Sequence, residues 1–522
     1  MNPTLLILIG GWIIVLIWLP LVISLNRKTH PRALFVLFFA EMWERFSYYG
    51  MRALLTLYMT KVLFFGEPDA ESTALSIYGA YTAMVYLFPL IGGLIADRIF
   101  GFRKAIMFGG VLMMLGHFTL ALEGLALDGS MPLFFMALAL IIIGNGYFKP
   151  NISSLLGRFY DQDDPRKDGA FTIFYMGINI GAFLATVTCG YVGEEINWHY
   201  GFGLAGIGMA LGLVAFGFNR AHLGDKGDPP ANRPGHRPVI GRITLNWVVY
   251  AGTALMLPIV ALMLNVNEVV SGLLLVASIG ILAYLVWEGW RTTDRVSGER
   301  LWVVGVLFVF HAVFWALFEQ AGGSLTLFTD KNVDRVVAGA EIPASVFQSL
   351  NPFYIIFLAP VFSALWIRLR ALGAEPSTPM KFVLGLTQLA LGFAVIVVAA
   401  EYFATNGLVP IVFLALMYLL HTTGEMTLSP IGLSMVTKLS PARIVGFVMG
   451  AWFLSIALAN NMAGLIGSLT ASDRAPQDVT PIESLPLYSG TYLIWGVVVV
   501  LGAAFVLLLL TPLLRRWMNG IR

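Results

Sequence analysis

A cluster of charged residues lies within an apolar stretch near the start of the chain. Glu41, Glu44 and Arg45 are spaced at i, i+3 and i+4, and Arg45, Tyr49 and Arg52 continue at i, i+4 and i+7. On a helix these positions share one face, so the spacing predicts a charged stripe about 16 Å long. Such groups can pair, pass protons or bind the charged ends of a small solute. The alternative is that they lie near a membrane edge and pair only with one another.

Three further ionisable residues lie inside apolar segments. Lys149 lies in the sequence GNGYFKPN, Glu319 in FWALFEQAGG and Glu425 in TGEMTLSP. Pro430 lacks a backbone N–H, so we expect it to unwind the helix beside Glu425. Alternatively, Lys149 reaches the membrane surface from a helix end, and each glutamate is only a structural hydrogen-bond partner.

The composition indicates a membrane protein. Of the 522 residues, 58% are hydrophobic and 12% are charged, against about 25% charged in soluble domains. So little charge excludes a water-soluble globule, and such hydrophobicity excludes a disordered chain. The net charge of +2 does not indicate a nucleic-acid partner, and the single cysteine, Cys189, excludes an internal disulfide and a cysteine-based metal site. We expect no metal and no cofactor.

The sequence carries no recognisable enzyme motif. It contains no Walker A loop, no GxSxG and no HExxH, and its seven histidines are scattered. Gly144-x-Gly146 follows no predicted strand, so we do not interpret it as a dinucleotide-binding loop. The sequence therefore predicts neither an enzyme nor an ATP-driven pump.

Fifteen apolar segments are long enough to cross a bilayer, which takes about 20 helical residues. They lie at residues 4–25, 33–60, 73–96, 105–127, 131–157, 169–192, 198–218, 243–264, 268–290, 302–328, 345–369, 380–402, 408–437, 443–470 and 487–514. The expected fold is an all-α polytopic membrane protein. The first segment has no basic region before it and no cleavage site after it, so we expect a retained spanning helix, or alternatively an accessory helix that does not span.

The distribution of Lys and Arg predicts the orientation. Loops after alternate segments hold 25 of the 32 basic residues, and the opposite loops hold four, Lys61, Lys331, Arg335 and Arg474. Because cytoplasmic loops are enriched in Lys and Arg, the C-terminus and the 219–242 linker are predicted to lie inside and the N-terminus outside.

Seven ionisable residues are interpreted as lying deep within the segments. An unpaired ion at the bilayer centre costs about 3 kcal/mol or more, so we expect these residues to face a polar cavity rather than lipid. They are Glu41, Glu44, Arg45, Arg52, Lys149, Glu319 and Glu425.

Two loops on the predicted inner side carry further signals. One combines Gly93, Asp97, Arg98 and Gly101, and we expect it to act as a breakable cytoplasmic latch, although an ordinary positive loop would explain its basic residues. The linker at 219–242 is rich in Pro, Gly and Arg and is predicted to be a flexible connector.

Four motifs together resemble the proton-dependent oligopeptide transporters, the peptide-transporter branch of the major facilitator superfamily. They are Glu41-x-x-Glu44-Arg45-Phe-x-Tyr48-Tyr49-Gly50-x-Arg52, the Asp97 loop, Phe174-Tyr175-x-x-Ile178-Asn179-x-Gly181, and Glu425-x-x-x-Ser429-Pro430-x-Gly432. The Asp97 loop alone indicates only the superfamily, whereas the first motif with the other two is highly specific. The motifs run from residue 41 to about 452.

The resemblance implies two six-helix bundles around a central site, with two inserted helices as in bacterial members. The domains would be an extra N-terminal helix at 1–31, an N-terminal bundle at 32–220, a linker with the inserted helices at 221–300 and a C-terminal bundle at 301–522. The extra first helix departs from the usual fourteen-helix pattern, and Ala182 and Phe183 replace the commoner Ser and Leu. Gly79 stands where animal members carry a proton-handling histidine, so proton handling would fall to carboxylates.

The resemblance also implies a substrate site. The carboxylate of a di- or tripeptide is expected near Arg45, Arg52 and Lys149, and its amino group near Glu425. The other peptide-binding residues implied by matched position are Tyr49, Tyr86, Tyr175, Asn179, Asn351, Ser429 and Trp452. A zwitterion about 5–10 Å long would be clamped by cations on one bundle and a carboxylate on the other.

Coupling to protons is implied by the same charges. Arg52 would pair with Glu319, and Lys149 with Glu425 or the glutamate pair of the first motif, until protonation of a carboxylate released one bundle from the other. The predicted function is proton-coupled import of di- and tripeptides by alternating access. The chain would work as a monomer in the bacterial inner membrane, driven by the proton gradient.

Two other functions stay open. One is a symporter of the same family for another small solute such as nitrate, and the other is a non-transporting membrane sensor or scaffold. The complete first motif together with Glu425 favours an amino-terminated substrate. A channel is disfavoured, because the charges do not form repeated rings.

Overall fold

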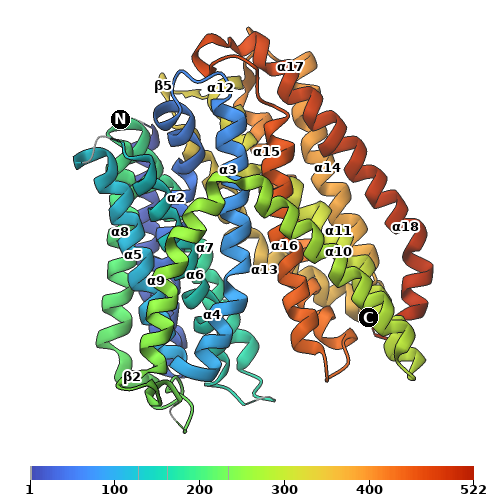
Figure 1. The fold of residues 1–522 in the computed structure, drawn as a ribbon. Helices are drawn as coiled ribbons and strands as arrows, with labels where there is room; N and C mark the ends of the chain where they lie inside the picture. The colour runs from blue at the N-terminus through green and yellow to red at the C-terminus, as the bar shows by residue number, and fades with distance from the viewer. Residues whose placement is uncertain (1–2, 127–128, 162, 233, 522) are drawn as a thin grey trace. The chain divides into compact units, whose positions relative to one another are not determined.

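The computed structural model describes residues 3–126, 129–161, 163–232 and 234–521 and is predominantly helical (Figure 1). Its first half contains α1 (Pro3–Asn26), α2 (Arg32–Tyr58), η1 (Met59–Leu63), α3 (Ala70–Leu87), α4 (Pro89–Ile95), η2 (Ala96–Phe100), α5 (Phe102–Ala126), α6 (Met131–Gly157), α7 (Lys167–Glu195), α8 (Trp198–Phe218), η3 (Arg220–Leu223) and η4 (Pro234–His236).

The second half begins with the hairpin of β1 (Pro238–Ile240) and β2 (Ile243–Thr244). The helical elements that follow are α9 (Leu245–Asn265), α10 (Asn267–Arg291), α11 (Arg295–Phe318), η5 (Glu319–Gly322), α12 (Ser324–Asn332), η6 (Ala344–Ser349), α13 (Leu350–Ala371), α14 (Thr378–Tyr402), α15 (Ile411–Leu439), α16 (Val445–Ser468), η7 (Pro476–Asp478), α17 (Pro481–Thr491), η8 (Tyr492–Val499) and α18 (Val500–Trp517). Short strands pair β3 (Val333–Asp334) with β6 (Val409–Pro410) in parallel, and β4 (Val336–Val337) with β5 (Ala340–Glu341) in antiparallel fashion.

Fourteen segments of the described chain are long and apolar enough to cross a membrane. The remaining expected segment is α2, which is 27 residues long but carries the charged cluster. The all-α polytopic fold is therefore confirmed. The expected break beside Glu425 is wrong, because α15 runs as one helix through position 430. A break lies instead at Glu319, where α11 passes into the 3-10 turn η5 before Gly323.

The chain divides into two compact units. Unit 1 comprises Met1–Tyr58, Met84–Val266 and Val336–Pro352, and unit 2 comprises Met59–Ala83, Asn267–Arg335 and Phe353–Arg522. Relative to the predicted bundles, each unit contains one segment from the other, 59–83 in unit 2 and 336–352 in unit 1. The bundle boundaries themselves stay a prediction.

Glycines allow helices to enclose α2 in unit 1. A Cβ at Gly181 of α7 would lie 2.2 Å from the carbonyl oxygen of Met42, and a Cβ at Gly208 of α8 would lie 2.5 Å from the ring of Phe46. Larger side chains at either position would push the neighbouring helix away from α2. These contacts bury the charged face of α2 among helices.

The two glycines of Gly144-x-Gly146 serve packing. A Cβ at Gly144 would lie 2.6 Å from the carbonyl oxygen of Gly109 in α5, and a Cβ at Gly146 would lie 2.8 Å from Phe88 at the start of α4. Helix α6 is thereby pressed against α5 and α4, and this fixes the direction of the side chains that lie between and after the two glycines.

The extra first helix packs within unit 1. Trp12 of α1 donates a hydrogen bond to Thr188 of α7 at 3.0 Å, and its ring lies 6.3 Å from that of Trp43 in α2. A Cβ at Gly11 would lie 2.9 Å from the ring of Phe183, one of the residues that departs from the family pattern. Phe183, which replaces the commoner Leu, therefore forms part of the surface of α7 against which α1 packs.

The two inserted helices belong to different units. Helix α9 lies against α6 in unit 1 (Figure 1), where Tyr147 and Thr253 share a hydrogen bond of 2.9 Å. Helix α10 lies in unit 2, where Glu288 pairs with Arg443 and the ring of Tyr284 lies 4.8 Å from that of Phe447.

The 219–242 linker, predicted to be a flexible connector, contains short elements and contacts α5, and its flexibility stays a prediction. It contains η3, η4 and part of the β1–β2 hairpin, and Arg103 N of α5 donates a hydrogen bond to Gly227 O at 3.0 Å. Gly101 has a φ of +73°, and a Cβ there would lie 2.5 Å from Pro229 N, so the close approach of the linker requires glycine.

Adjacent glycines test the packing account. A Cβ at Gly92 would lie 2.0 Å from Gly146 O, whereas a Cβ at Gly93 meets nothing nearer than 3.8 Å. Gly92→Ala should therefore destabilise the fold by about 1–3 kcal/mol, and Gly93→Ala should leave it nearly unchanged. Thermal unfolding in detergent measures both, and equal unfolding temperatures would contradict the close α4–α6 contact.

Candidate functional site

The charged residues of α2 form a buried ion cluster. Arg45 Nε lies 3.2 Å from Glu41 Oε1 and also donates a hydrogen bond to Glu44 Oε2. Glu44 is fully buried and the other two side chains are about 4–5% exposed. One guanidinium thus serves two carboxylates in a low-dielectric environment, where each charge depends strongly on its partners.

Two atoms of this cluster have no hydrogen-bond partner among the described residues. They are Glu41 Oε2 and Arg45 Nη2. Leaving a buried charged group partly unsatisfied costs roughly 1–3 kcal/mol or more. An acceptor oxygen and a donor nitrogen are therefore available within the cluster, one suited to a proton and the other to an anion.

Helix α6 supplies two side chains to the same cluster. Asn145 Nδ2 donates a hydrogen bond to Glu44 Oε1 at 3.1 Å, and the charge of Lys149 acts on Glu41. The two positions are one helical turn apart, and the glycines on either side of Asn145 pack against other helices. Asn145 was not predicted as a site residue, although its position four residues before Lys149 was a usable signal.

Aromatic rings cover the cations of unit 1. The guanidinium of Arg45 lies 5.5 Å from the ring centre of Tyr48, that of Arg52 lies 5.8 Å from Tyr49, and Lys149 Nζ lies 4.0 Å from Tyr86. A cation over an aromatic face retains its N–H donors at the edge for another partner. The predicted aromatic residues Tyr49 and Tyr86 are therefore in contact with the predicted cations.

The remaining predicted site residues of unit 1 lie on α7 and at the start of α13. Asn179 Nδ2 donates to Tyr175 O at 3.0 Å, so its amide nitrogen is engaged within α7, and the Tyr175 side chain is 45% exposed. Asn351 is half-buried at the start of α13 and belongs to unit 1 together with α2 and α7.

In unit 2, Glu319 lies at the break between α11 and α12. It is 4% exposed, and the next residue, Gln320, bonds to the carbonyl oxygens of Ala316 and Ala463. Glu425 is half-buried in the middle of α15. The Ser429 side chain lies outside the described residues. The pairs Arg52–Glu319 and Lys149–Glu425 join different units and stay predictions.

Trp452 is buried in this structure. Its ring lies 4.2 Å from that of His311 and its side chain packs against Gly432, where a Cβ would lie 2.8 Å from the indole. His311 in turn shares a hydrogen bond of 2.7 Å with Ser455. Contact with a substrate would require Trp452 to move out of this packing.

The predicted latch residues lie around η2. Asp97 and Arg98 are exposed, Gly93 faces Pro150, and Gly101 contacts the linker. Exposure leaves both charged side chains accessible at the end of α4, and their role as a latch stays a prediction.

The expectation that only seven ionisable residues are buried is wrong. Glu123 is fully buried and accepts a hydrogen bond of 2.9 Å from Tyr58, and Lys381, one of the 25 basic residues counted in the inner loops, is 7% exposed in the first turn of α14. Other buried carboxylates are Glu71, Glu288 and Glu299. Each has a partner near a helix end, which segment hydropathy alone does not reveal.

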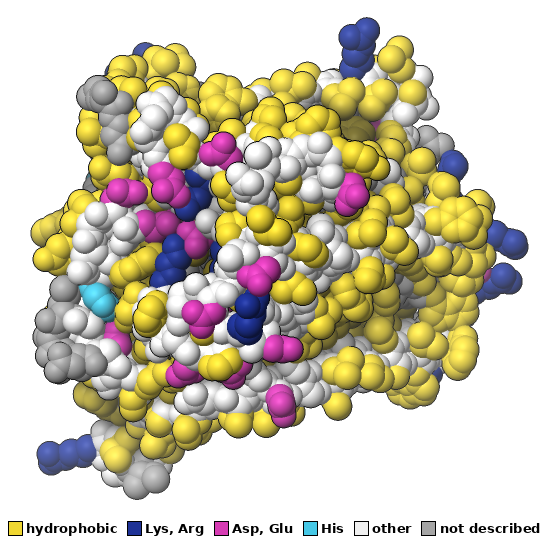
Figure 2. Space-filling view, turned by 90° about the horizontal axis from the view of Figure 1, so that it is seen from above, with side chains coloured by type: hydrophobic (Ala, Val, Ile, Leu, Met, Phe, Trp, Pro, Cys, Tyr) yellow, Lys and Arg dark blue, Asp and Glu magenta, His cyan; other side chains and the backbone are white. Residues whose placement is uncertain are grey.

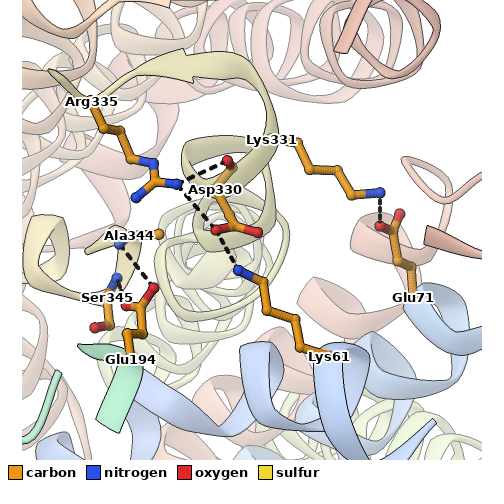
Figure 3. A network of polar contacts seen from close by, with 8 residues as sticks. All are labelled: Lys61, Glu71, Glu194, Asp330, Lys331, Arg335, Ala344 and Ser345. Atoms are coloured by element: carbon orange, nitrogen blue, oxygen red, sulfur yellow. Dashed lines mark hydrogen bonds and ion pairs between the residues drawn. The ribbon is translucent and has the colours of Figure 1, made fainter. Parts of the chain in front are cut away.

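The four basic residues predicted to lie outside are all paired with carboxylates. Lys61 Nζ lies 2.7 Å from Asp330 Oδ1, Arg335 Nη2 lies 3.4 Å from the same oxygen, Lys331 pairs with Glu71, and Arg474 Nη2 lies 2.8 Å from Glu483 Oε1. The first three pairs lie within unit 2 (Figure 3). Figure 2 looks onto the end at which α12 and α17 lie in Figure 1, and it shows acidic side chains gathered around basic ones.

Ion pairs in the predicted inner loops shift pKa values. Hydrogen bonds from Arg166 hold the pKa of Asp164 at about 2, and those from Arg370 and Lys381 hold the pKa of Glu375 at about 2. Burial lowers the pKa of His30, which shares a hydrogen bond of 3.0 Å with Tyr160. These loops therefore keep their carboxylates charged at physiological pH.

Comparisons with known proteins agree with the fold. A family model described as the POT family matches residues 103–480. An uncharacterized transporter of Bacillus subtilis, YclF, is 37% identical over 498 residues, and dipeptide and tripeptide permease B of Salmonella typhimurium is 33% identical over 490 residues. Each alignment covers 94% of this chain and 96% of the relative. A crystal structure of the peptide transporter POT in complex with sulfate is 38% identical, with a TM-score of 0.78 over 94% of this chain and 96% of that one.

The buried cluster predicts a specific stability pattern. Arg45→Met would leave two carboxylates without their cation and should destabilise the protein by about 3–5 kcal/mol. Adding Glu41→Gln and Glu44→Gln should restore most of that loss, because no buried charge then remains unpaired. Arg474→Met, which breaks an exposed pair, should cost less than about 1 kcal/mol. Thermal unfolding in detergent checks the series, and a triple variant no more stable than Arg45→Met would contradict the account.

Proposed function

The chain belongs to the POT family, and from that premise we propose that it imports di- and tripeptides together with protons by alternating access. As a member of this family it is a multi-pass membrane transporter and not an enzyme. The observation that carries the proposal is the ion cluster of α2, in which one arginine is shared by two buried glutamates.

Binding of the peptide carboxylate follows from the cations of unit 1. Arg45 Nη2 has no hydrogen-bond partner among the described residues, and the cations of Arg52 and Lys149 lie over the rings of Tyr49 and Tyr86. A carboxylate accepts two parallel bonds from a guanidinium and adds a point contact with an ammonium group. The peptide carboxylate would thus bring negative charge to a group of three cations.

Proton binding is assigned to the two glutamates of the cluster. While both are ionised, they compete with the peptide carboxylate for Arg45. Protonating one of them would leave a single carboxylate on the guanidinium and free a donor for the substrate. Glu41 is the better candidate, because its Oε2 has no hydrogen-bond partner among the described residues, whereas Glu44 is also bonded to Asn145.

The packing around Gly79 supports carboxylates over a histidine as the proton carriers. A Cβ at Gly79 would lie 2.8 Å from the Cα and 3.0 Å from the backbone nitrogen of Gly464 in α16, within unit 2. An imidazole at this position would displace the α16 backbone. Proton handling would accordingly fall to the glutamates, as the sequence predicts.

The driving force is adequate for accumulation. Each unit of pH difference supplies about 1.4 kcal/mol per proton, and each 100 mV of membrane potential supplies about 2.3 kcal/mol per charge. A peptide zwitterion that moves with one proton carries net positive charge, so both terms would favour import. On this proposal the proton gradient drives transport, no cofactor takes part, and the chain works as a monomer.

The outside end is the part of the structure that supports alternating access. Segment 59–83, from the predicted N-terminal bundle, packs with α12 and α16 in unit 2, and its Lys61 and Glu71 pair with Asp330 and Lys331 (Figure 3). Conversely, segment 336–352 packs with α7 in unit 1, where Glu194 accepts hydrogen bonds from the backbone N–H groups of Ala344 and Ser345 at 3.2 and 2.8 Å.

On this proposal, the segments 59–83 and 336–352 would take part in opening and closing the outer side. Polar pairs can break and re-form as the bundles move, whereas a continuous apolar interface would resist separation. We assign the protein to the bacterial inner membrane. The distribution of Lys and Arg places the linker and the C-terminus in the cytoplasm on this proposal.

Transport in proteoliposomes tests the function. Accumulation of a labelled dipeptide should fall at least about tenfold when the proton gradient is collapsed. One unit of pH difference alone supplies about 1.4 kcal/mol, which corresponds to about a tenfold concentration ratio, and the membrane potential adds to it. Glu41→Gln should lose gradient-driven uptake, and Glu268→Gln, an exposed matched change at the start of α10, should keep it. Unlabelled dipeptide should compete for uptake and nitrate should not. Uptake that ignores the gradient would refute coupling, and competition by nitrate alone would refute the peptide substrate.

The outer ion pairs predict a second result. Asp330→Asn removes the partner of both Lys61 and Arg335, and it should speed hydrogen exchange of backbone amides in segment 59–83 about fivefold, which corresponds to about 1 kcal/mol. Glu483→Gln breaks a pair confined to the predicted C-terminal bundle and should leave that segment unchanged. Hydrogen-exchange mass spectrometry measures both, and unchanged exchange in Asp330→Asn would exclude this ion pair as an outer closure.

A further inference from the structure

A basic cavity lies in unit 1 at the ends of α5 and α8, away from the α2 cluster. It has a volume of about 530 Å³ and is lined by side chains of α5, α8 and the following linker. Its cations are Arg103, Lys104 and Arg220, and its only lining carboxylate among the described residues is Asp228. Both helix ends lie on the side that the Lys and Arg distribution predicts to be cytoplasmic.

The charges of this cavity are not balanced within it. Asp228 pairs with Arg103, which leaves Lys104 and Arg220 without a carboxylate among the lining residues. The ammonium of Lys104 lies 4.3 Å from the ring centre of Phe100 and 5.1 Å from that of Tyr250, and Arg220 is exposed. Two positive groups therefore remain available to an anion, since the rings hold Lys104 without consuming its N–H donors.

An apolar surface leads away from the cations. A second cavity of about 430 Å³ adjoins the first, because Gly217 and Arg220 line both, and its other walls are Val214 and Phe218. These two side chains are 52% and 86% exposed, and Ile207 and Leu211 continue the exposed face at 48% and 44%. Positions 207, 211, 214 and 218 follow helical spacing, so they form one stripe along α8 that ends at Arg220.

A ligand that matches both parts must carry an anionic head and a long apolar tail. A soluble phosphate would leave the stripe unused, and a zwitterionic lipid would bring a second cation into a cavity that already has an excess of positive charge. We propose that this cavity binds an anionic phospholipid, such as phosphatidylglycerol, with its phosphate at Lys104 and Arg220 and an acyl chain along the α8 stripe.

The bound lipid would also hold the linker in place. Gly227 O accepts the hydrogen bond from Arg103 N, and Asp228 lines the cavity directly beside it. A phosphate at Lys104 and Arg220 would lower the repulsion among these two cations and Arg103. It would thereby stabilise the contact between the linker and α5. This proposal concerns a membrane contact and does not depend on the identity of the transported substrate.

Native mass spectrometry of the full chain in mixed micelles tests the proposal. The wild type should retain phosphatidylglycerol in preference to phosphatidylcholine, and Lys104→Gln/Arg220→Gln should reduce that retention about 25-fold, or about fivefold per cation. Arg237→Gln/Arg242→Gln is the matched control, because it removes two exposed cations from the same linker that do not line the cavity. Equal retention by the pocket variant and the control would overturn the proposal.

A second variant separates lipid from free phosphate. Val214→Ser/Phe218→Ser removes part of the apolar stripe and leaves the cations, so it should weaken phosphatidylglycerol binding several-fold. Glycerol 3-phosphate at the same concentration should not displace the lipid from the wild type. Full displacement, or unchanged lipid retention by the stripe variant, would show a site for a soluble phosphate and would overturn the lipid assignment.

Discussion

The sharing of Arg45 between Glu41 and Glu44 is the interaction on which the other features of the site depend. Moving each of these ions out of water costs several kcal/mol, and the loss is offset only while the ions remain together and hydrogen-bonded. Two carboxylates for one guanidinium leave the cluster with an excess of negative charge, which Lys149 of α6 reduces. On the proposed function, such a cluster would respond both to the proton and to the peptide carboxylate that arrives with it.

Two kinds of contact surround this cluster, close helix packing next to it and polar contacts at one end of the molecule. Glycines at 144, 146 and 181 bring α6 and α7 against their neighbours at backbone distance, so the cluster is enclosed by rigid contacts. The end that is predicted to lie outside is different, because segments 59–83 and 336–352 are held by ion pairs and by hydrogen bonds to Glu194. Close helix packing encloses the cluster, whereas ion pairs and hydrogen bonds hold these two segments.

The sequence was sufficient for the elements and for the side chains that carry charge, because apolar length and helical spacing are local properties. It predicted the apolar helical segments and placed Glu41, Glu44 and Arg45 on one face, and the structure agrees, except that segment 302–328 is broken at Glu319. It missed Asn145, the burial of Glu123 and the folding of the linker onto Arg103, since these depend on which helices become neighbours. A helix break was predicted beside Pro430, whereas the structure has one at Glu319. Neighbouring helices can support a proline within a helix, and the adjacent Gly322 and Gly323 were the stronger signal for a break.

The central claim is that the glutamates of α2 carry the proton that drives the peptide. The most direct measurement compares peptide exchange with proton movement in proteoliposomes that contain a trapped pH indicator. An imposed dipeptide gradient should acidify the lumen with the wild-type protein. Glu41→Gln/Glu44→Gln should still exchange labelled for unlabelled dipeptide across the membrane but should move no protons. Proton movement by that variant at the wild-type ratio to peptide would contradict the claim and assign the proton to another group.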